Sequence, residues 1–325
     1  MTFSSPHVPT RIGIVAIGRN EGERLMRCLR SLDGSGAAVV YVDSASTDGS
    51  ADRARALGAH VVDLDMALPF TAARARNAGL AALPSVELVQ FVDGDCELDA
   101  DWLPKATAFL DAHADVAVVC GRRRERFPDA SVFNRLCDME WDTPVGEAAA
   151  CGGDSLMRAD AVRALGGFRD TLTAGEEPEL CARLRAAGWR VWRIDAEMTR
   201  HDAAMLRFRQ WWWRSVRTGF GYAQAGDATA ALPQPLYRTE VKRAMLWAGI
   251  LPFVGVALGL LVHPLFLLLP IVAFGVQIAR IAWRNRAYGM YIRHAWYTML
   301  SKFPELQGIL RYRRARQHRS AITYK

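Results

Sequence analysis

The sequence lacks the patterns that mark several common classes of protein. Its six cysteines include no Cys-x-x-Cys pair, which argues against a zinc cluster. Residues 1–10 lack the long apolar core of a secretory signal peptide. Scattered cysteines in a chain without such a signal are usually buried, reduced thiols. We therefore expect the main folded part of the chain to face the cytosol.

Charge is almost absent from residues 244–283, where Arg280 is the only charged residue. Elsewhere the chain is typical of a globular protein, and overall 51% of its residues are hydrophobic and 23% are charged. Residues 244–262 and 264–283 each approach the length of about 20 apolar residues that crosses a bilayer. His263 and Pro264 leave room only for a tight turn between them.

Basic residues flank this apolar pair on both outer sides, and none lies in the turn. The positive-inside tendency then places both outer ends in the cytosol. A hairpin of two crossing helices or a re-entrant pair would satisfy the pattern, and a helical pair buried in a soluble core is the third interpretation. We favour membrane association, because apolar runs of this length are costly in water.

The net charge of +7 indicates attraction to an anionic partner, either a membrane, a phosphorylated substrate or a nucleic acid. The sequence contains no nucleic-acid-binding motif, so we expect no nucleic acid partner. Much of the excess charge lies beside or after the apolar stretch, which favours a membrane surface. These basic residues are Lys242, Arg243, Arg280, Arg284, Arg286, Arg293, Arg311, Arg313, Arg314, Arg316 and Arg319.

Short apolar runs alternate with helical patterns in the first two hundred residues. This alternation predicts an α/β domain with a mostly parallel sheet. Ligands of such sheets bind beyond the carboxyl ends of the strands, so Asp43 and Asp93, which end two of them, should converge on one crevice. The predicted strands are residues 12–17, 39–42, 60–64, 86–92, 116–120 and 191–194, and the predicted helices are residues 25–32, 51–57, 71–82 and 176–187.

Asp93, Gly94 and Asp95 follow one of the predicted buried strands. Two carboxylates separated by one residue both reach a divalent cation if the backbone turns sharply between them, which Gly94 permits. Oxygen ligands suit Mg²⁺ or Mn²⁺. Such an ion would bridge the phosphates of a nucleotide diphosphate and neutralise that group as it leaves. The tripeptide is also common in ordinary turns, so its place after a strand carries the interpretation.

Asp43 stands at the start of a turn-rich segment, residues 44–50. A carboxylate at a strand end can accept a hydrogen bond from an N–H group of a nucleoside base. Ser46, Thr47 and Asp48 are better explained as caps of the following helix.

Four motifs, taken together, resemble family 2 glycosyltransferases, which have the GT-A fold. The resemblance covers roughly residues 11–225 and rests on the order and spacing of the motifs rather than on any single one. The motifs are Ala16-Ile17-Gly18-Arg19-Asn20-Glu21, Val42-Asp43-Ser44-Ala45-Ser46-Thr47-Asp48, Ala75-Arg76-Asn77-Ala78-Gly79 and Asp93-Gly94-Asp95.

The resemblance implies inverting transfer of a sugar from a UDP-, GDP- or dTDP-linked donor, with Mg²⁺ or Mn²⁺ as cofactor. It places a GT-A domain with a Rossmann-like mixed sheet at residues 1–235. A membrane-associated helical region with a basic tail would follow at residues 236–325. The residues implied to bind the donor are Asn20, Glu21, Asp43, Arg76, Asn77 and Asp93, and those implied to bind the metal are Asp93, Asp95 and His201.

An inverting transfer needs one general base near the acceptor hydroxyl. The family usually has Glu-Asp where this sequence has Glu176-Glu177, and the second carboxylate acts as the base. We therefore assign Glu177 as the base, with Glu176 as the alternative. Pro178 fits the first turn of a helix, where no amide donor is needed. Without a catalytic role, the two carboxylates would simply be favourable at a helix N-terminus.

Two further segments bear on the acceptor. Residues 151–155, Cys-Gly-Gly-Asp-Ser, resemble the small-residue strand that borders the acceptor site, although packing alone would also explain them. Residues 210–214 resemble the Gln-x-x-Arg-Trp signature of processive members, but Trp213 and Arg214 stand in reversed order. This difference favours transfer of a single sugar. A lipid-linked glycan or polysaccharide acceptor would account for the apolar segments.

The sequence therefore predicts a metal-dependent, inverting glycosyltransferase at the cytosolic face of the cytoplasmic membrane. One alternative is a nucleotidyl or phosphoglycosyl transferase on the same scaffold, which would not need Glu177. The other is a non-catalytic membrane scaffold, and the combined presence of Asp43, Asp93-Gly94-Asp95 and the glutamate pair argues against it.

Overall fold

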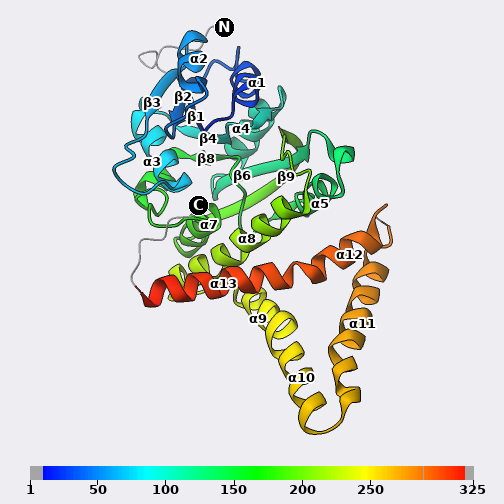
Figure 1. Ribbon diagram of the computed structural model, residues 1–325. Coiled ribbons are helices and arrows are strands. Elements are labelled where there is room, and N and C mark those ends of the chain that lie inside the picture. Colours follow the sequence, from blue (N-terminus) through cyan, green and yellow to red (C-terminus); the bar gives the residue numbers. More distant parts are fainter. Residues whose placement is uncertain (1–9, 288, 319–325) are drawn as a thin grey trace. The chain divides into compact units, whose positions relative to one another are not determined.

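The computed structural model describes residues 10–287 and 289–318 (Figure 1). These residues form two compact units. The first contains residues 10–206 and 228–236, and the second contains the described residues of 207–227 and 237–320. The sequence places residues 207–227 in the first domain, whereas in the structure they pack with the second unit.

A mixed sheet forms the centre of the first unit, in the order β3-β2-β1-β4-β8-β6-β9-β5, with β7 paired to β9. Strands β3, β2, β1 and β4 run parallel, as predicted. Strand β8 is antiparallel to both β4 and β6, and β9 is parallel to β6. The strands are β1 (Ile12–Gly18), β2 (Ala38–Asp43), β3 (His60–Asp63), β4 (Leu88–Asp93), β5 (Cys96–Leu98), β6 (Val116–Glu125), β7 (Gly146–Glu147), β8 (Ser155–Arg158) and β9 (Arg190–His201).

Helices connect the strands and enclose the apolar core of this unit (Figure 1). Every residue of β2 and the five central residues of β1 are buried, which is typical of parallel strands covered on both faces. The helices are α1 (Glu23–Ser31), α2 (Ser50–Ala56), α3 (Ala72–Ala82), α4 (Trp102–Ala112), the 3₁₀ helix η1 (Pro128–Ala130), α5 (Val132–Glu140), α6 (Ala159–Ala164) and α7 (Glu176–Ala186).

Three strands, β5, β7 and β8, are absent from the sequence-based prediction. Strands β5 and β7 contain three and two residues, which is too short for an alternating pattern to show. Strand β8 contains four residues, and only Ser155 of these lies in the segment 151–155 that resembles a strand. Each forms because a longer strand from another part of the chain offers it backbone partners. The pairing of β5 with β9 brings Cys96 opposite His201.

The ends of β2 and β4 lie at one edge of the sheet, on either side of β1. In the strand register Gly18 is paired with Asp43, and Ile17 is paired with Asp93. The predicted convergence of the two aspartates at the carboxyl edge is therefore confirmed.

Helix α3 packs unusually close to this edge because of a glycine. A Cβ atom on Gly79 would lie 2.3 Å from Cγ1 of Val15 on β1, so only glycine permits the approach. The same helix carries Arg76, one turn earlier. Close packing of α3 therefore positions Arg76 over the ends of the strands.

The second unit is entirely helical in its described part. Two of its helical stretches, Arg238–Leu261 and Pro264–Arg284, contain 24 and 21 residues and are apolar enough to cross a membrane. They form a hairpin (Figure 1) in which Gly255 contacts Pro270 and Gly259 contacts Leu267. The elements are α8 (Phe208–Ala228), α9 (Arg238–Met245), the π-helix η2 (Leu246–Ile250), α10 (Leu251–Leu261), the 3₁₀ helix η3 (Pro264–Leu267), α11 (Leu268–Arg284), α12 (Tyr291–Leu300) and α13 (Lys302–Gln317).

Helices α8 and α13 cross at two glycines. A Cβ atom on Gly219 would lie 2.0 Å from the carbonyl oxygen of Glu305, and one on Gly308 would lie 2.0 Å from that of Val216. No side chain fits in these positions, so the two backbones touch directly. This contact explains why residues 207–227 belong to the second unit.

We expect Gly308→Ala to destabilise the second unit by about 1–3 kcal/mol, because the added methyl group would overlap the backbone of α8. Gly275→Ala on α11 is the matched control, since a Cβ there meets no atom within 4 Å. It should be neutral or stabilise the helix by up to about 1 kcal/mol. Thermal unfolding followed by circular dichroism in detergent measures both, and equal melting temperatures would contradict the close crossing.

Candidate active site

Arg76 on α3 is the centre of the site, and it is 2% exposed. Its guanidinium donates hydrogen bonds to Oδ1 of Asp93 and Oε1 of Glu176, each at 2.8 Å. Oε1 of Glu177 also lies 2.8 Å from it. Burial by itself would lower the pKa of Arg76, but the charges of the three carboxylates raise it above its usual value. The arginine is therefore charged and joins two motifs that are distant in the sequence.

Glu176 and Glu177 begin α7, after Gly175 in the left-handed conformation (φ 84°). The N-terminal end of a helix favours negative charge. The side chain of Glu177 is 14% exposed and that of Glu176 is 5% exposed. Burial raises the pKa of Glu177 to about 7, against the effect of Arg76 and with the support of neighbouring carboxylates. Glu177 is thus both the more accessible of the pair and able to exchange a proton near neutral pH.

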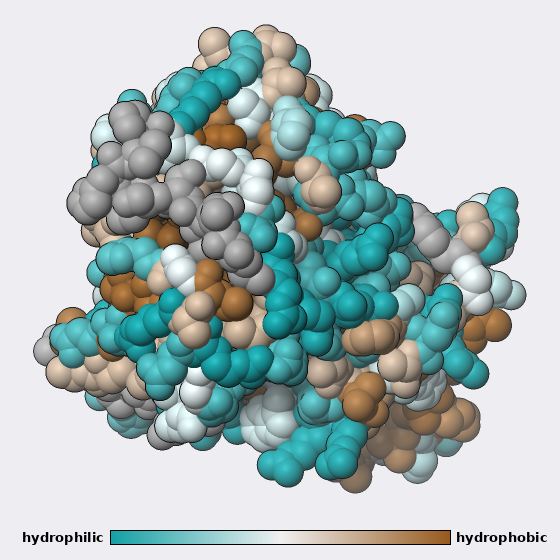
Figure 2. Space-filling view, turned by 90° about the horizontal axis from the view of Figure 1, so that it is seen from above, coloured by the Kyte–Doolittle hydropathy of each residue, from teal (hydrophilic) through white to brown (hydrophobic). Residues whose placement is uncertain are grey.

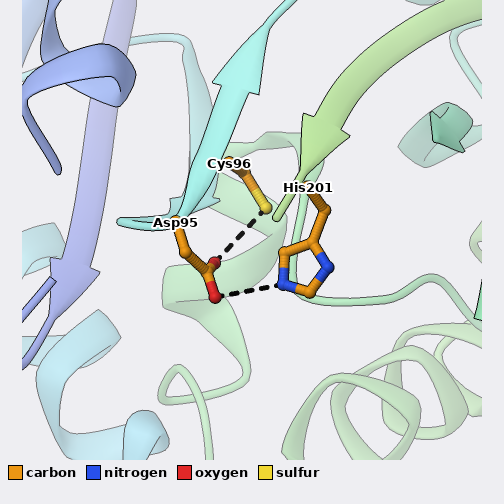
Figure 3. A group of neighbouring side chains, drawn as sticks. All are labelled: Asp95, Cys96 and His201. Carbon is orange, nitrogen blue, oxygen red and sulfur yellow. Dashed lines mark hydrogen bonds and ion pairs between the residues drawn. The ribbon is translucent and has the colours of Figure 1, made fainter. Parts of the chain in front are cut away.

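Asp95 faces His201 across the junction of β5 and β9 (Figure 3). Nε2 of His201 lies 3.1 Å from Oδ2 of Asp95, and Sγ of Cys96 lies 3.6 Å from Oδ1. Burial alone would raise the pKa of Asp95. The hydrogen bond to His201 and nearby positive charges outweigh this effect and hold the pKa below its usual value. Asp95 is therefore ionised at neutral pH.

Asp95, Cys96 and His201 place one potential ligand atom each within 4.8 Å of one another. Burial raises the pKa of the Cys96 thiol well above its usual value, so the sulfur stays protonated. A thiol also suits softer ions than Mg²⁺ or Mn²⁺. Asp95 and His201 are therefore the members of this group that fit a hard divalent cation.

Negative charge exceeds positive charge among the described residues of the site. A divalent cation would reduce this imbalance, which is a second reason why the site fits one. The carboxylates are Asp93, Asp95, Asp154, Glu21, Glu176 and Glu177, and the arginines in contact with them are Arg24, Arg76 and Arg123.

Asp93 is more constrained than Asp95. Its Oδ1 accepts from Arg76, and its Oδ2 lies 3.4 Å from the guanidinium of Arg123. Burial raises the pKa of Asp93 although both arginines oppose this effect. The structure thus separates the two aspartates of the motif, because Asp93 is held by arginines and Asp95 by a histidine.

Sequence reasoning missed Asp154 and Arg123. Asp154 is fully buried, and it accepts hydrogen bonds from the backbone N–H of Asp93 (3.0 Å) and the hydroxyl of Thr199 (2.7 Å). Arg123 pairs with Asp154 at 2.7 Å and lies over the ring of Trp141. The only sequence signal was their position, one in a basic run and the other directly after two glycines. Together they anchor the end of β4.

The two glycines before Asp154 differ in their surroundings. A Cβ atom on Gly153 would lie 2.6 Å from Oδ2 of Asp93 and 2.7 Å from Nη2 of Arg76. One on Gly152 would meet no atom within 4 Å. Gly153 is therefore required by the charged cluster, whereas Gly152 borders open space.

Asp43 is 3% exposed, and its own surroundings already supply hydrogen bonds. The hydroxyls of Tyr41 and Ser46 donate to Oδ1 at 2.9 and 2.6 Å, and the Ser46 backbone N–H donates to Oδ2 at 2.8 Å. Oδ2 keeps one lone pair for a further donor. Asn20, in the left-handed conformation (φ 57°), accepts from the backbone N–H of Thr47 and so joins the loops that follow β1 and β2.

Ser46 and Thr47 do not cap α2, which corrects the expectation from the sequence. The helix begins at Ser50, and its N-cap is Gly49, which has no side chain to accept a hydrogen bond. Asp48 accepts from the backbone N–H of Ser50 at 3.0 Å. The serine and threonine instead bind Asp43 and Asn20, as described above.

Glu21 packs beside the Asp-Gly-Asp turn. A Cβ atom on Gly94 would lie 3.5 Å from Cγ of Glu21, and Arg24 lies 2.8 Å from the Glu21 carboxylate. Burial raises the pKa of Glu21 to about 7, and the charge of Asp95 adds to the effect while that of Arg24 opposes it. Glu21 therefore lies close to the candidate metal ligand Asp95 as well as to the loop that is predicted to bind the nucleoside.

Asn77 is occupied by the loop that follows α6. Its Nδ2 donates to the carbonyl of Phe168 and to Oδ1 of Asp170, each at 2.7 Å. The backbone N–H of Phe168 donates to Oδ1 of Asn77 at 2.9 Å. The observed contacts of Asn77 fix this loop, and its contact with a nucleotide stays a prediction.

Comparison with known proteins matches residues 14–143 to the model of glycosyl transferase family 2. An uncharacterized glycosyltransferase of Mycobacterium tuberculosis is 33% identical over 186 residues, which cover 54% of this chain and 79% of that protein. The chain belongs to glycosyl transferase family 2. The predicted family is therefore confirmed, and the matched segment runs from β1 to three residues beyond α5.

Two further proteins extend the comparison of this family 2 chain. Pre-mycofactocin glycosyltransferase of Mycobacterium tuberculosis is 28% identical over 265 residues, 76% of this chain and 54% of that protein, so the match spans about half the length of the relative. The mannosyltransferase PcManGT of Pyrobaculum calidifontis superposes with a TM-score of 0.59 at 18% identity, over 94% of this chain and 88% of that one. The likeness confirms the predicted GT-A fold.

In this family 2 chain we expect Arg76→Met to lower the free energy of unfolding by about 3–5 kcal/mol, because it removes the counter-ion that Asp93, Glu176 and Glu177 share. Of the three, only Asp93 keeps an arginine nearby, Arg123. Those carboxylates then bind protons more readily when folded than when unfolded. The deficit should therefore shrink as the pH falls from about 8 to about 5. Urea unfolding at both pH values measures it.

The control is Arg74→Met on the same helix. Arg74 binds the backbone carbonyls of Asp65, Leu68 and Pro69 near the surface. Its substitution should lower the free energy of unfolding by less, and this loss should show no comparable pH dependence. An equal, pH-independent loss in both variants would argue against a charged cluster around Arg76.

Proposed function

We propose that this chain is a metal-dependent, inverting glycosyltransferase that moves a sugar from a nucleotide-diphosphate donor to an acceptor hydroxyl. The observation that carries the proposal is that Nη2 of Arg76 lies 2.8 Å from both Oδ1 of Asp93 and Oε1 of Glu177. One guanidinium thus joins the Asp-Gly-Asp motif to the candidate base. Inverting transfer needs this proximity, because the base must act on the acceptor while the donor is in place.

Glu177 takes the proton of the acceptor hydroxyl in this mechanism. The acceptor oxygen forms a bond to the anomeric carbon as the bond from that carbon to the nucleotide diphosphate breaks, so the configuration inverts. A pKa of about 7 suits a base that works near neutral pH. Glu176 is deeper and hydrogen-bonded to Arg76, which supports a positioning role for it and the base role for Glu177.

Asp95 and His201 would hold the metal, with Asp93 beside them. The carboxylate of Asp95 is a hard donor and the imidazole of His201 is a borderline one, and the excess of carboxylates favours a cation at this place. When bound, Mg²⁺ or Mn²⁺ neutralises the charge of the departing diphosphate. The structure of PcManGT was obtained with GDP-Man and Mn²⁺, which supports the same cofactor class here.

The donor is proposed to be a UDP-, GDP- or dTDP-sugar. Asn20 and Glu21 lie on the loop after β1, and Asp43 ends β2, so all three are at the carboxyl edge where a nucleoside would bind. The free lone pair on Oδ2 of Asp43 can accept from an N–H group of the base. Arg76 and Asn77 would line the nucleotide pocket, Arg76 through its charge and Asn77 through the loop it fixes.

The acceptor is proposed to be a lipid-linked glycan or a polysaccharide at the cytosolic face of the cytoplasmic membrane. The most apolar windows of the two long helices are only 17% and 6% buried, which argues against a soluble core. Phe253, Leu260 and Leu261 are each more than 70% exposed. The face seen in Figure 2 is mostly hydrophilic, with hydrophobic residues gathered near its lower right margin. Apolar surface of this extent favours lipid over water.

We expect Glu177→Gln to reduce sugar transfer by about 10²–10⁴-fold, because an amide cannot accept the proton. The rate of the unsubstituted chain should rise as the pH increases through about 7, since the base works only when deprotonated. Release of the nucleoside diphosphate from a panel of UDP-, GDP- and dTDP-sugars, with Mn²⁺ and a glycan acceptor mixture, measures both.

The control variants separate the alternatives. Glu147→Gln changes an exposed residue paired with Arg190 and should leave the rate unaltered. Asp95→Asn should remove the metal-dependent activity. Diphosphate release that persists unchanged in Glu177→Gln would refute the base assignment. Release of a nucleoside monophosphate or of pyrophosphate in place of the diphosphate would point to phosphoglycosyl or nucleotidyl transfer, and lack of turnover with every donor would favour a non-catalytic scaffold.

We expect the turn between the long helices and the start of α9 to lie on opposite sides of the membrane. All cysteines of the sequence are buried, so a membrane-impermeant maleimide should label an introduced, exposed cysteine selectively. In sealed vesicles His263→Cys should react from one side and Thr239→Cys, at the start of α9, from the other. Labelling of both cysteines from the same side would show that the helices form a re-entrant pair. Recovery of soluble, active protein without detergent would refute the membrane association.

A further inference from the structure

Two buried thiols meet next to the candidate active site. Sγ of Cys151 lies 3.5 Å from Sγ of Cys181, and Cys151 is also 3.5 Å from the hydroxyl of Ser155. Cys151 belongs to the segment before β8, and Cys181 belongs to α7. The pair therefore links two elements that are distant in the sequence.

Each thiol stands close to residues of the proposed mechanism. Cys181 is one helical turn after Glu177 on α7, so it lies on the same side of that helix. Cys151 is two residues before Gly153, whose backbone fits tightly against Asp93 and Arg76. A covalent bond between the thiols would thus join the helix of the candidate base to the segment that packs on the charged cluster.

We propose that Cys151 and Cys181 are a modification site, at which a hydroperoxide converts the two thiols into a reversible disulfide. Cys151 attacks the peroxide oxygen, forms a sulfenic acid and releases water or an alcohol. The sulfur of Cys181 then attacks the sulfenic sulfur, the S–S bond forms, and water leaves. Two thiols are oxidised by two electrons, and the hydroperoxide is reduced by two.

The surroundings favour Cys151 as the thiol that reacts first. It is 7% exposed and precedes Gly152, which borders open space, whereas Cys181 is fully buried. The hydrogen bond with Cys181 lowers the pKa of Cys151 although burial opposes this effect. Burial instead raises the pKa of Cys28 and Cys96. The thiolate is the reactive form, so these two should react more slowly.

Formation of the disulfide would strain the tight packing at Gly153. The two sulfurs would have to approach by roughly 1.5 Å, because a disulfide bond is about 2.05 Å long. Drawing Cys151 toward α7 would shift the segment that contains Gly153, which has no room for even one added carbon beside Asp93 and Arg76. This consequence rests on the proposed function, and oxidation should then slow sugar transfer severalfold in a way that thiols reverse.

The pairing is tested on the full chain in detergent. The reduced protein is exposed to hydrogen peroxide, free thiols are blocked with N-ethylmaleimide, and peptides are mapped by mass spectrometry. We expect a cross-linked peptide pair containing Cys151 and Cys181 that disappears with dithiothreitol. Cys137→Ser, a buried cysteine on α5, should leave the cross-link unchanged. This readout needs no donor, so it is independent of the enzymatic proposal.

A second variant identifies the order of events. In Cys181→Ser the sulfenic acid of Cys151 should persist and react with dimedone. The proposal is overturned if both thiols stay reduced at peroxide levels that oxidise the exposed thiol of Thr239→Cys, or if Cys181 links to Cys120 instead. If the cross-link forms but sugar transfer is measurable and not slowed, the cysteine pair is still a modification site, and its proposed effect on the candidate active site is refuted.

Discussion

A buried guanidinium surrounded by carboxylates is the constraint on which the rest of the site depends. A charge buried as deeply as Arg76 is costly unless it is paired, and three carboxylates pair with this guanidinium. Its partners come from the end of β4 and the start of α7, so neither element can shift without leaving a charge unpaired. Gly79 and Gly153 let the backbone approach from two directions, which explains glycine at both positions.

Excess negative charge then divides the carboxylates by role. The pKa of Asp95 is held below its usual value by His201, so Asp95 remains an anion that suits a metal. Burial and neighbouring anions raise the pKa of Glu177 to about 7, so it can take up a proton. Pairs of titratable groups with pKa values pushed apart are typical of acid–base sites. Both environments arise within one cluster, because Asp95 faces a histidine whereas Glu177 is enclosed beside other carboxylates.

The second unit depends on a different kind of packing. Its helices approach through glycines, with Gly219 and Gly308 at the crossing of α8 and α13 and Gly255 in the apolar hairpin. Small residues allow backbones to meet without help from hydrophobic burial, which is the usual solution for helices in lipid. The exposed apolar surface of α10 and α11 agrees with that environment.

The sequence by itself determined the parallel half of the sheet, the aspartates at its edge and the two long apolar helices. Each of these features is visible in a short stretch of sequence, as a periodic pattern, a long apolar run or a characteristic turn residue. Only the tertiary structure decided that Arg123 and Asp154 anchor the site, that Cys151 faces Cys181, and that residues 207–227 pack with the second unit. The short strands β5, β7 and β8 belong with these. All depend on contacts between segments far apart in the chain, which no local pattern records.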